Sequence, residues 1–501
     1  MAVDTPCVQY KAMADEGSWD LCADLLGGTP AMRSARTKWL PQEPDEKTKN
    51  YNVRLKRSFL NNAYKDTIEK YVARPFSRPA IWNIKGNDEA LAAIDPIMEN
   101  MDGEGMHHQA FAKEVFDMLM RWGVASTFVD YPAIDNPDET TKADEQAENL
   151  QPLCSVLKTT NVIGWESKKQ KNGTDKLIEV RVKETHIADT DNWEQTVYDQ
   201  IRVITPEGYK LWRREKRAGR TGNSEEYVPN GGGTFVMAGK APDEIPIVTG
   251  YTKKTGMLTS LPPFLELAWV NLEDWISRSD QKNILRFDRF GILVGSGFTE
   301  DEVKKGLTVA PTQAILSENP EAKMARVETN GKPAENGWND IHDISERMEI
   351  LGMAPMIQRL ANVKATGIAA NESKSRSQIE SWIEEANLVM RKTMQLILAW
   401  MGFDVALDDI EYNIYQDFVF STQQAQEVKD VIEARKMGDL SHRTFIREMQ
   451  RFGRLSDKVD PDEEKALVEV EKGRGLSLFN NAQTQQGAGA GQPIGEVGAT
   501  I

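Results

Sequence analysis

The sequence predicts a multidomain α+β protein in which helical and β-rich segments occupy separate stretches of the chain. Three observations predict this class. Apolar residues recur at helical spacing in several segments, most clearly over residues 379–401. Residues 153–251 instead carry short runs of β-branched and aromatic residues, separated by turn residues. The chain has 501 residues, which is enough for several domains.

Composition and charge narrow the possible functions. Hydrophobic residues make up 40% of the chain and no apolar run reaches the roughly 18 residues needed to span a bilayer, so we expect no membrane segment. The first residues lack a signal-peptide pattern. Cys7, Cys22 and Cys154 are dispersed, which argues against a disulfide framework or a zinc site. The net charge of -16 excludes nucleic-acid binding by bulk attraction, although DNA can still pass along a local surface.

The first third of the chain is predicted to be mainly helical. Residues 1–38 read as a loosely docked N-terminal arm with a short helix near Trp19. Residues 51–72 predict one helix, which the two prolines of Arg74-Pro75-Phe76-Ser77-Arg78-Pro79 end. Helices are expected at 87–101 and 107–121, and a strand at 125–129.

The next segment turns to β structure. Residues 133–151 are acidic and are expected to form an exposed loop. Thr205-Pro206-Glu207-Gly208 predicts a turn. Residues 210–220 are strongly basic, and predict either a solvated hairpin tip or a contact for phosphate or an acidic partner. Strands are expected at 153–158, 176–183, 196–204, 208–213, 233–238 and 246–251.

A long helix is expected over residues 262–290, with Pro262-Pro263 at its start. Acidic residues come first in this helix and basic residues come last, which complements the helix macrodipole. The basic residues are Arg278, Lys282, Arg286 and Arg289. Apolar positions become sparse after Ile276, so the second half is not expected to be an ordinary core helix. Short strands follow from 291 and around 307–328, and a helix returns at 338–351.

The clearest helix in the sequence carries an apolar stripe from Ile379 to Met401 and is expected to stop at Gly402. Its start is ambiguous, because Thr366 and Ser377 are both suitable N-caps. Residues 356–370, just before it, predict an irregular and locally basic loop. A strand at 411–420 and helices at 422–437, 442–452 and 461–472 are expected to follow, and residues 473–501 are expected to be disordered.

We find no catalytic motif in the sequence. There is no Walker A sequence and no His-Glu-x-x-His, so we expect a protein that is not an enzyme and needs no cofactor. Two alternatives stay open at this point. The helix pair at 422–452 is compatible with a helix-turn-helix regulator that presents His442, Arg443, Arg447 and Arg451 to DNA. Abundant carboxylates are compatible with an unrecognised metal-dependent enzyme.

Several stretches, in their order along the chain, resemble the portal proteins of tailed bacteriophages, and in particular an uncharacterised branch of portal type. They are Trp39-Leu40-Pro41, residues 51–57, 61–67 and 74–79, Val129-Asp130-Tyr131-Pro132, residues 262–268 and 279–285, Met348-Glu349-Ile350-Leu351-Gly352, residues 438–444, and the acidic helix at 461–472. The resemblance covers roughly residues 39–472.

The resemblance implies a portal-like domain plan. A wing would comprise residues 39–260 and 373–420, stem helices 262–290 and 335–352, a clip 291–334, a tunnel loop 353–372 and a crown 421–472. The clip is short for the family, so the resemblance does not specify how a terminase would dock.

The resemblance also implies a function. Family members form a ring, commonly of twelve copies, at one vertex of the capsid in the virion, and are assembled in the host cytoplasm. Double-stranded DNA enters and leaves through the ring, which serves as the head–tail connector. Implied partners are further copies of the chain, the terminase large subunit, the head–tail adaptor, and the major capsid and scaffolding proteins, with no membrane.

Two groups of basic residues would face DNA in such a channel. The tunnel loop offers Arg359, Asn362 and Lys364, whose phosphate contacts would carry no sequence information. Alternatively, Arg359 and Lys364 pair with acids of a neighbouring subunit. The stem offers its four basic residues, Arg278, Lys282, Arg286 and Arg289.

Overall fold

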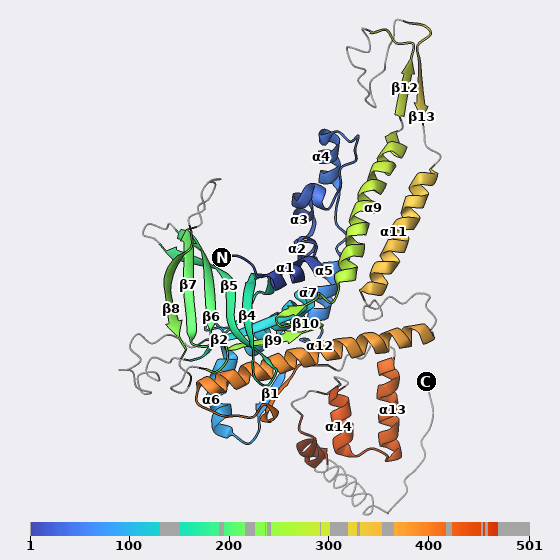
Figure 1. The fold of residues 1–501 in the computed structure, drawn as a ribbon. Helices are drawn as coiled ribbons and strands as arrows, with labels where there is room; N and C mark the ends of the chain where they lie inside the picture. The colour runs from blue at the N-terminus through green and yellow to red at the C-terminus, as the bar shows by residue number, and fades with distance from the viewer. Residues whose placement is uncertain are drawn as a thin grey trace, which may run out of the picture. The chain divides into compact units, whose positions relative to one another are not determined.

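The computed structural model describes residues 2–130, 151–189, 195–215, 226–235, 237, 242–290, 292–300, 319–327, 331–352, 365–416, 423–451, 454–455 and 459–468. The chain divides into two compact units, Met1–Gln416 and Asp417–Ile501. The first unit combines helices with antiparallel sheets, and the described part of the second is helical (Figure 1). The α+β class and the multidomain organisation are therefore as predicted.

The N-terminal residues are an integral part of the first unit. Leu21, Leu25 and Met32 have no exposed surface. The expectation of a loosely docked arm at 1–38 was wrong, because α2 covers parts of both α5 and α9. The helices concerned are α1 (Val8–Glu16), α2 (Trp19–Leu26), α3 (Gly28–Ala35), α5 (Ala63–Ala73) and α9 (Leu265–Phe290), with a 3-10 turn η1 (Arg36–Lys38).

The single helix predicted over residues 51–72 is two helices, α4 (Thr48–Arg57) and α5. Asn62 caps α5, since its side-chain oxygen accepts a hydrogen bond from the Lys65 N–H at 3.0 Å. The cap marks the start of α5, while α4 already ends at Arg57, where Ser58 adopts an extended conformation. Phe59 lies in the break and is 59% exposed, so it is not part of a buried helix face.

Two antiparallel sheets form the β-rich part of the first unit. The five-stranded sheet has the order β4-β5-β6-β7-β8, and in the other β2 pairs with both β3 and β9. Thr205 pairs with Gly208 across the tight β6–β7 hairpin, as the turn residues predicted. The strands are β2 (Val124–Asp130), β3 (Leu153–Leu157), β4 (Val162–Lys169), β5 (Asp175–Asp189), β6 (Gln195–Thr205), β7 (Gly208–Glu215), β8 (Val228–Thr234) and β9 (Ile247–Tyr251).

Some strands depart from the expectation. Strand β4 was missed, because its second half is polar and exposed. Strand β8 lies at 228–234 rather than 233–238. The remaining described elements of this part are helices α6 (Asp88–Glu99) and α7 (His108–Trp122), which were predicted, and the short strands β10 (Lys254–Gly256) and β11 (Thr259–Ser260).

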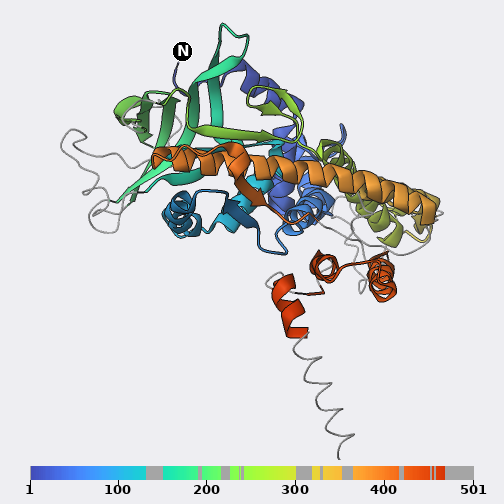
Figure 2. The same ribbon diagram turned by 90° about the horizontal axis from the view of Figure 1, so that it is seen from below.

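Helix α12 (Ala365–Trp400) is the long helix that the sequence predicted. Its apolar stripe is fully buried from Ile379 to Ile397 and packs on β2, β9 and α7 (Figure 2). The helix begins next to Thr366, so Ser377 lies inside it and the longer of the two predicted helices is correct. Gly402 ends it at φ +86, as predicted. After the helix, β14 (Ile410–Asn413) pairs with β1 (Ile81–Ile84), a pairing that the sequence did not predict.

Helix α9 is followed by β12 (Ile292–Ser296), and β13 (Lys323–Val327) leads back into α11 (Lys332–Leu351). β12 and β13 pair antiparallel, and α9 packs along α11. Figure 1 shows the two helices side by side with the β12–β13 hairpin at one end. The helices predicted at 262–290 and 338–351 are therefore present, the second beginning several residues earlier than expected.

The second unit contains α13 (Gln423–Met437) and α14 (His442–Arg451). Ser441 caps α14 by accepting a hydrogen bond from the Thr444 N–H at 3.1 Å. Residues 461–468 are helical. The predicted acidic loop and the predicted disordered tail at 473–501 fall almost or entirely outside the described residues.

Candidate functional site

The helix pair α9–α11 is the candidate functional site, because its side chains are unusually polar for packed helices. Only one narrow stripe of α11 is buried, formed by Ala334, Ile341, Ile344 and Met348. Gly337 lies at the point of close approach, where an added Cβ would be 2.0 Å from the Gln281 side-chain oxygen. The Gln281 amide nitrogen donates to the Ala334 carbonyl at 2.7 Å. The helices are thus held by a thin apolar seam and a buried polar contact.

The other side of α9 is anchored to the N-terminal helices by buried polar groups. Asn271 accepts from the Tyr64 N–H at 3.0 Å and donates to the Asn61 carbonyl at 2.8 Å. The hydroxyls of Ser279 and Ser58 lie 2.9 Å apart. Because each of these side chains is satisfied, they fix the position of α9 rather than offer a ligand site.

The predicted basic residues of α9 lie on one face, because Arg278, Lys282 and Arg286 are spaced by four. We call these three residues the basic edge. Arg278 is not free, since its Nε lies 2.7 Å from a carboxylate oxygen of the fully buried Asp274. Burial raises the pKa of Asp274, and the Arg278 charge opposes that rise. Arg289 lies on the same helix, and its side chain is outside the described residues.

Lys282 and Arg286 are exposed, and no carboxylate in the described ranges lies within ion-pair distance of either. The Lys282 ammonium instead lies 4.9 Å from the centre of the Phe59 ring, and the Arg33 guanidinium lies 4.6 Å from the same ring. Burial, together with the positive charges of Arg278 and Arg33, lowers the pKa of Lys282. The basic edge is therefore a local excess of positive charge in an acidic chain.

A hollow of about 360 Å³ lies between the α4–α5 connection and the two helices. We call it the stem groove. Its aromatic walls are Phe59 and Trp338, which are 59% and 50% exposed, and Arg278 and Lys282 line it as well. The sequence indicated the basic residues but not the aromatic ones, because exposure of a single Phe or Trp depends on neighbours distant in sequence.

The outer side of α11 is acidic. Glu335, Asp343 and Glu346 are exposed on the side of the helix opposite the buried stripe, and Asp340 is exposed at the edge of that side. Arg347 forms an ion pair with Glu273 of α9 at 3.0 Å. We call the four carboxylates the acidic face. The helix pair thus carries opposite charges on two different surfaces.

The predicted tunnel-loop residues Arg359, Asn362 and Lys364 lie outside the described residues. The boundary given for that loop, 353–372, needs a correction. Helix α12 already begins at Ala365, so residues 365–372 belong to the helix and not to the loop.

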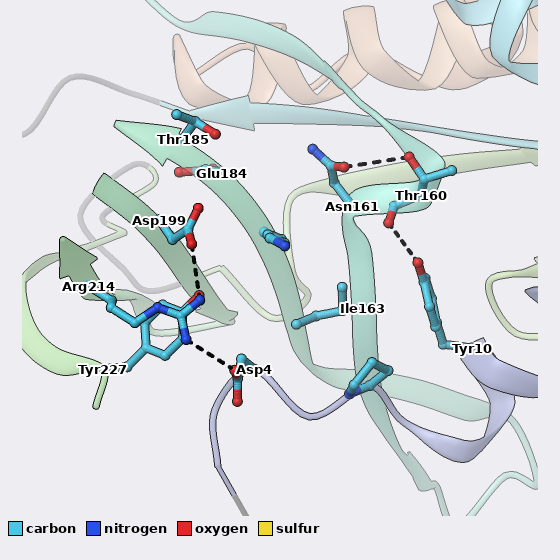
Figure 3. A pocket seen from close by; sticks show the side chains of 12 residues that line it. Asp4, Tyr10, Thr160, Asn161, Ile163, Glu184, Thr185, Asp199, Arg214 and Tyr227 are labelled. Carbon is cyan, nitrogen blue, oxygen red and sulfur yellow. Dashed lines mark hydrogen bonds and ion pairs between the residues drawn. The ribbon is translucent and has the colours of Figure 1, made fainter. Parts of the chain in front are cut away.

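A second hollow, of about 550 Å³, lies between the N-terminal segment and strands β4–β7. Figure 3 shows Arg214 between two carboxylates, with Asp199 at 3.0 Å and Asp4 at 4.0 Å. The Tyr10 hydroxyl donates to the Thr160 carbonyl at 2.8 Å. These contacts attach the N-terminal segment to the sheet.

This geometry also changes the interpretation of the basic stretch at 210–220. Arg213 and Arg214 lie within β7 and are half-buried, so they do not form a solvated hairpin tip. The Arg213 Nε donates to the Gln200 side-chain oxygen at 2.6 Å. Both guanidinium groups are used within the fold, and residues 216–220 lie outside the described residues.

The residues named for the two alternative functions can be placed in part. His442, Arg443 and Arg447 lie on α14 together with Glu448, and the acids Asp430 and Glu433 lie on α13. Among the described residues, no group of three or more His, Cys, Asp or Glu side chains is arranged to hold a metal ion. The helices within the described ranges include none with the length and apolar character needed to cross a membrane.

A protein-family model described as "Domain of unknown function (DUF4055)" matches residues 263–401. The match runs from just before α9 to just after α12, so it covers the stem groove except for Phe59 and its neighbours. No curated protein matches the chain.

Two solved structures are similar to the chain over most of its length. One is the neck of an empty GTA particle computed with C6 symmetry, with a TM-score of 0.40 and 9% identity over 78% of this chain and 90% of that chain. The other is the neck of a native GTA particle computed with C12 symmetry, with a TM-score of 0.37 and 10% identity over 76% of this chain and 87% of that chain.

Proposed function

We propose that this chain is a portal-type head–tail connector subunit of a tailed phage. Copies of it form a closed ring at one capsid vertex, through which double-stranded DNA is packaged and ejected. The observation that carries the proposal is the α9–β12–β13–α11 segment. α11 contributes a seam of only four buried residues, and the rest of α11 and the second half of α9 carry mostly polar and charged side chains, as expected for helices that line a wet channel and contact copies of themselves.

The order of elements supports the same function. A helix, a small β hairpin and a second helix precede the long α12, in the positions where the sequence resembles portal proteins. In this proposal α9 and α11 are the stem, β12 and β13 belong to the clip, and α13 and α14 belong to the crown. The clip docks the terminase first and the tail adaptor later.

The ring is tested by imaging. Purified protein, examined by negative-stain microscopy and mass photometry over a range of protein and Mg²⁺ concentrations, should give closed rings with a central channel. Because assembly of such proteins can require a trigger, native virions are imaged as well. A chain that stays monomeric or dimeric under all conditions, and forms no ring at a vertex of the virion, would refute the proposal.

In this proposal the protein hydrolyses no nucleotide and moves no DNA by itself. The energy for packaging comes from a separate terminase, since this sequence contains no phosphate-binding loop. Purified protein should show no ATP turnover above a heat-treated control. ATP turnover that is abolished by a substitution in this chain would contradict this part of the proposal.

The tunnel loop supplies the DNA contacts in this proposal. Changing Arg359 and Lys364 together to Ala should leave rings intact and reduce the length of DNA retained in particles, because two phosphate contacts per copy are lost. A matched control changes Lys168 and Lys169 of β4 to Ala, which removes the same charge elsewhere. Equal DNA retention in both variants would refute the role of the loop, and failure to form rings would indicate pairing with a neighbouring subunit.

A further inference from the structure

The stem groove has an unusual combination of properties. Two large aromatic side chains, Phe59 and Trp338, line it and are at least half exposed. The positive charges of Lys282 and Arg33 both lie over the Phe59 ring. Exposed aromatic surface rimmed by charge is typical of a surface that binds another protein, and the charge here selects an acidic partner.

The acidic face of α11 has the complementary chemistry. It presents Glu335, Asp340, Asp343 and Glu346 from about three turns of one helix, and none of them has a cation within ion-pair distance among the described residues. Glu335, Asp343 and Glu346 point away from α9, on the opposite side of α11 from the buried stripe, and Asp340 lies at the edge of that face. The acidic face therefore cannot reach the stem groove of its own chain, although it can reach the groove of another copy.

We propose that the acidic face of one copy docks against the stem groove and basic edge of the next copy. Each copy then uses two different surfaces, and such a head-to-tail contact closes into a ring when the rotation between neighbours permits. The closure of this contact into a ring rests on the proposed function. The contact itself rests on the chemistry of the two surfaces.

DNA is the other acidic ligand that a basic edge attracts, and the groove favours a protein instead. Phe59 and Trp338 would gain nothing from a phosphate backbone, whereas they bury apolar area against the aliphatic parts of a helix. The carboxylates on the neighbouring helix α11 would also repel DNA. Lys282 and Arg286 therefore belong to the contact between subunits rather than to the channel wall.

Charge reversal tests the contact. One variant carries Lys282→Glu and Arg286→Glu, and a second carries Asp343→Lys and Glu346→Lys. A control carries Lys168→Glu and Lys169→Glu on the exposed part of β4, which gives the same charge change as the first variant. All six side chains are exposed, so the variants should fold like the wild type, and circular dichroism and thermal scans check this.

Sedimentation velocity then measures association. Wild type and control should associate, and association should weaken when salt is raised from about 50 mM to about 500 mM, because exposed charges are screened. Each reversed variant alone should associate about tenfold or more weakly, because like charges then face each other. An equimolar mixture of the two variants should associate again, since native surfaces meet native ones and reversed surfaces meet reversed ones.

Three results would overturn the inference. They are wild type that remains monomeric at low salt, reversed variants that associate like the control, and a mixture that does not recover. A first variant that forms normal rings but loses DNA would assign the basic edge to DNA and would also overturn it, while leaving the proposed ring intact. If the mixture of the two variants associates again but forms no ring, the contact between the two surfaces is supported and the portal function is contradicted.

Discussion

Replacing Arg54 by Met should destabilise the first unit more than any loss of a surface ion pair. The Arg54 side chain is only 4% exposed, and its guanidinium makes several contacts at once. It donates to Glu46 at 2.8 and 3.0 Å and to the Pro41 carbonyl at 2.6 Å, and lies 3.4 Å from Asp280 of α9. Met keeps most of the apolar stem of the side chain, so the substitution mainly removes the charge and the hydrogen bonds.

The magnitude follows from what is left behind. The Glu46 side chain is 12% exposed, and its carboxylate would stay in place without a partner. Removing one member of a buried pair costs about 3–5 kcal/mol, and the partial exposure of Glu46 and Asp280 places this case near the lower value. Arg54 also lowers the pKa of Glu46 by hydrogen bonding, so part of the loss should disappear at acidic pH, where Glu46 is protonated.

Differential scanning calorimetry and urea unfolding measure the effect. The matched control is Lys85→Met, which removes an ion pair to Glu411 at 2.6 Å whose side chains are 56% and 39% exposed, and should change little. Adding Glu46→Gln to Arg54→Met should recover part of the loss, because the unpaired charge is removed. If Arg54→Met and Lys85→Met shift the unfolding midpoint equally, the account of Arg54 as a buried anchor is wrong.

Two further predictions concern the body of the first unit. Burial lowers the pKa of His108 from 6.5 to about 4. The neutral histidine should therefore contribute up to about 3 kcal/mol to the free energy of unfolding, a contribution that is fully present above pH 6.5 and is lost as pH falls toward 4. His108→Gln should flatten that part of the stability–pH curve, and an unchanged slope would contradict this prediction. Gly123→Ala should be severely destabilising, because φ is +80 and the new Cβ would lie 2.1 Å from the Leu261 carbonyl oxygen. The control Gly86→Ala, at φ +70 with no atom within 4 Å, should cost only about 1 kcal/mol. Equal melting temperatures of the two variants would show that the close approach at Gly123 is not rigid.

Helix periodicity made much of the architecture predictable. The stripe from Ile379 to Ile397 could be recognised because all of its members face one core, so the helical repeat appears directly in the sequence. The same holds for the buried stripe of α11 and for the caps at Ser441 and Gly402. These features depend on residues within one or two turns of each other, and the candidate stem could therefore be located without coordinates.

Only the tertiary structure decided which polar side chains are satisfied and which aromatic side chains remain exposed. Arg54 and Asp280 are 226 residues apart, β1 pairs with β14 from the far end of the unit, and α2 is buried because α5 and α9 lie over it. For the same reason the basic edge looked uniform in sequence, although Arg278 is neutralised by Asp274 while Lys282 and Arg286 are not. Local spacing determines the face on which a side chain lies, and only contacts between distant segments determine what that face meets.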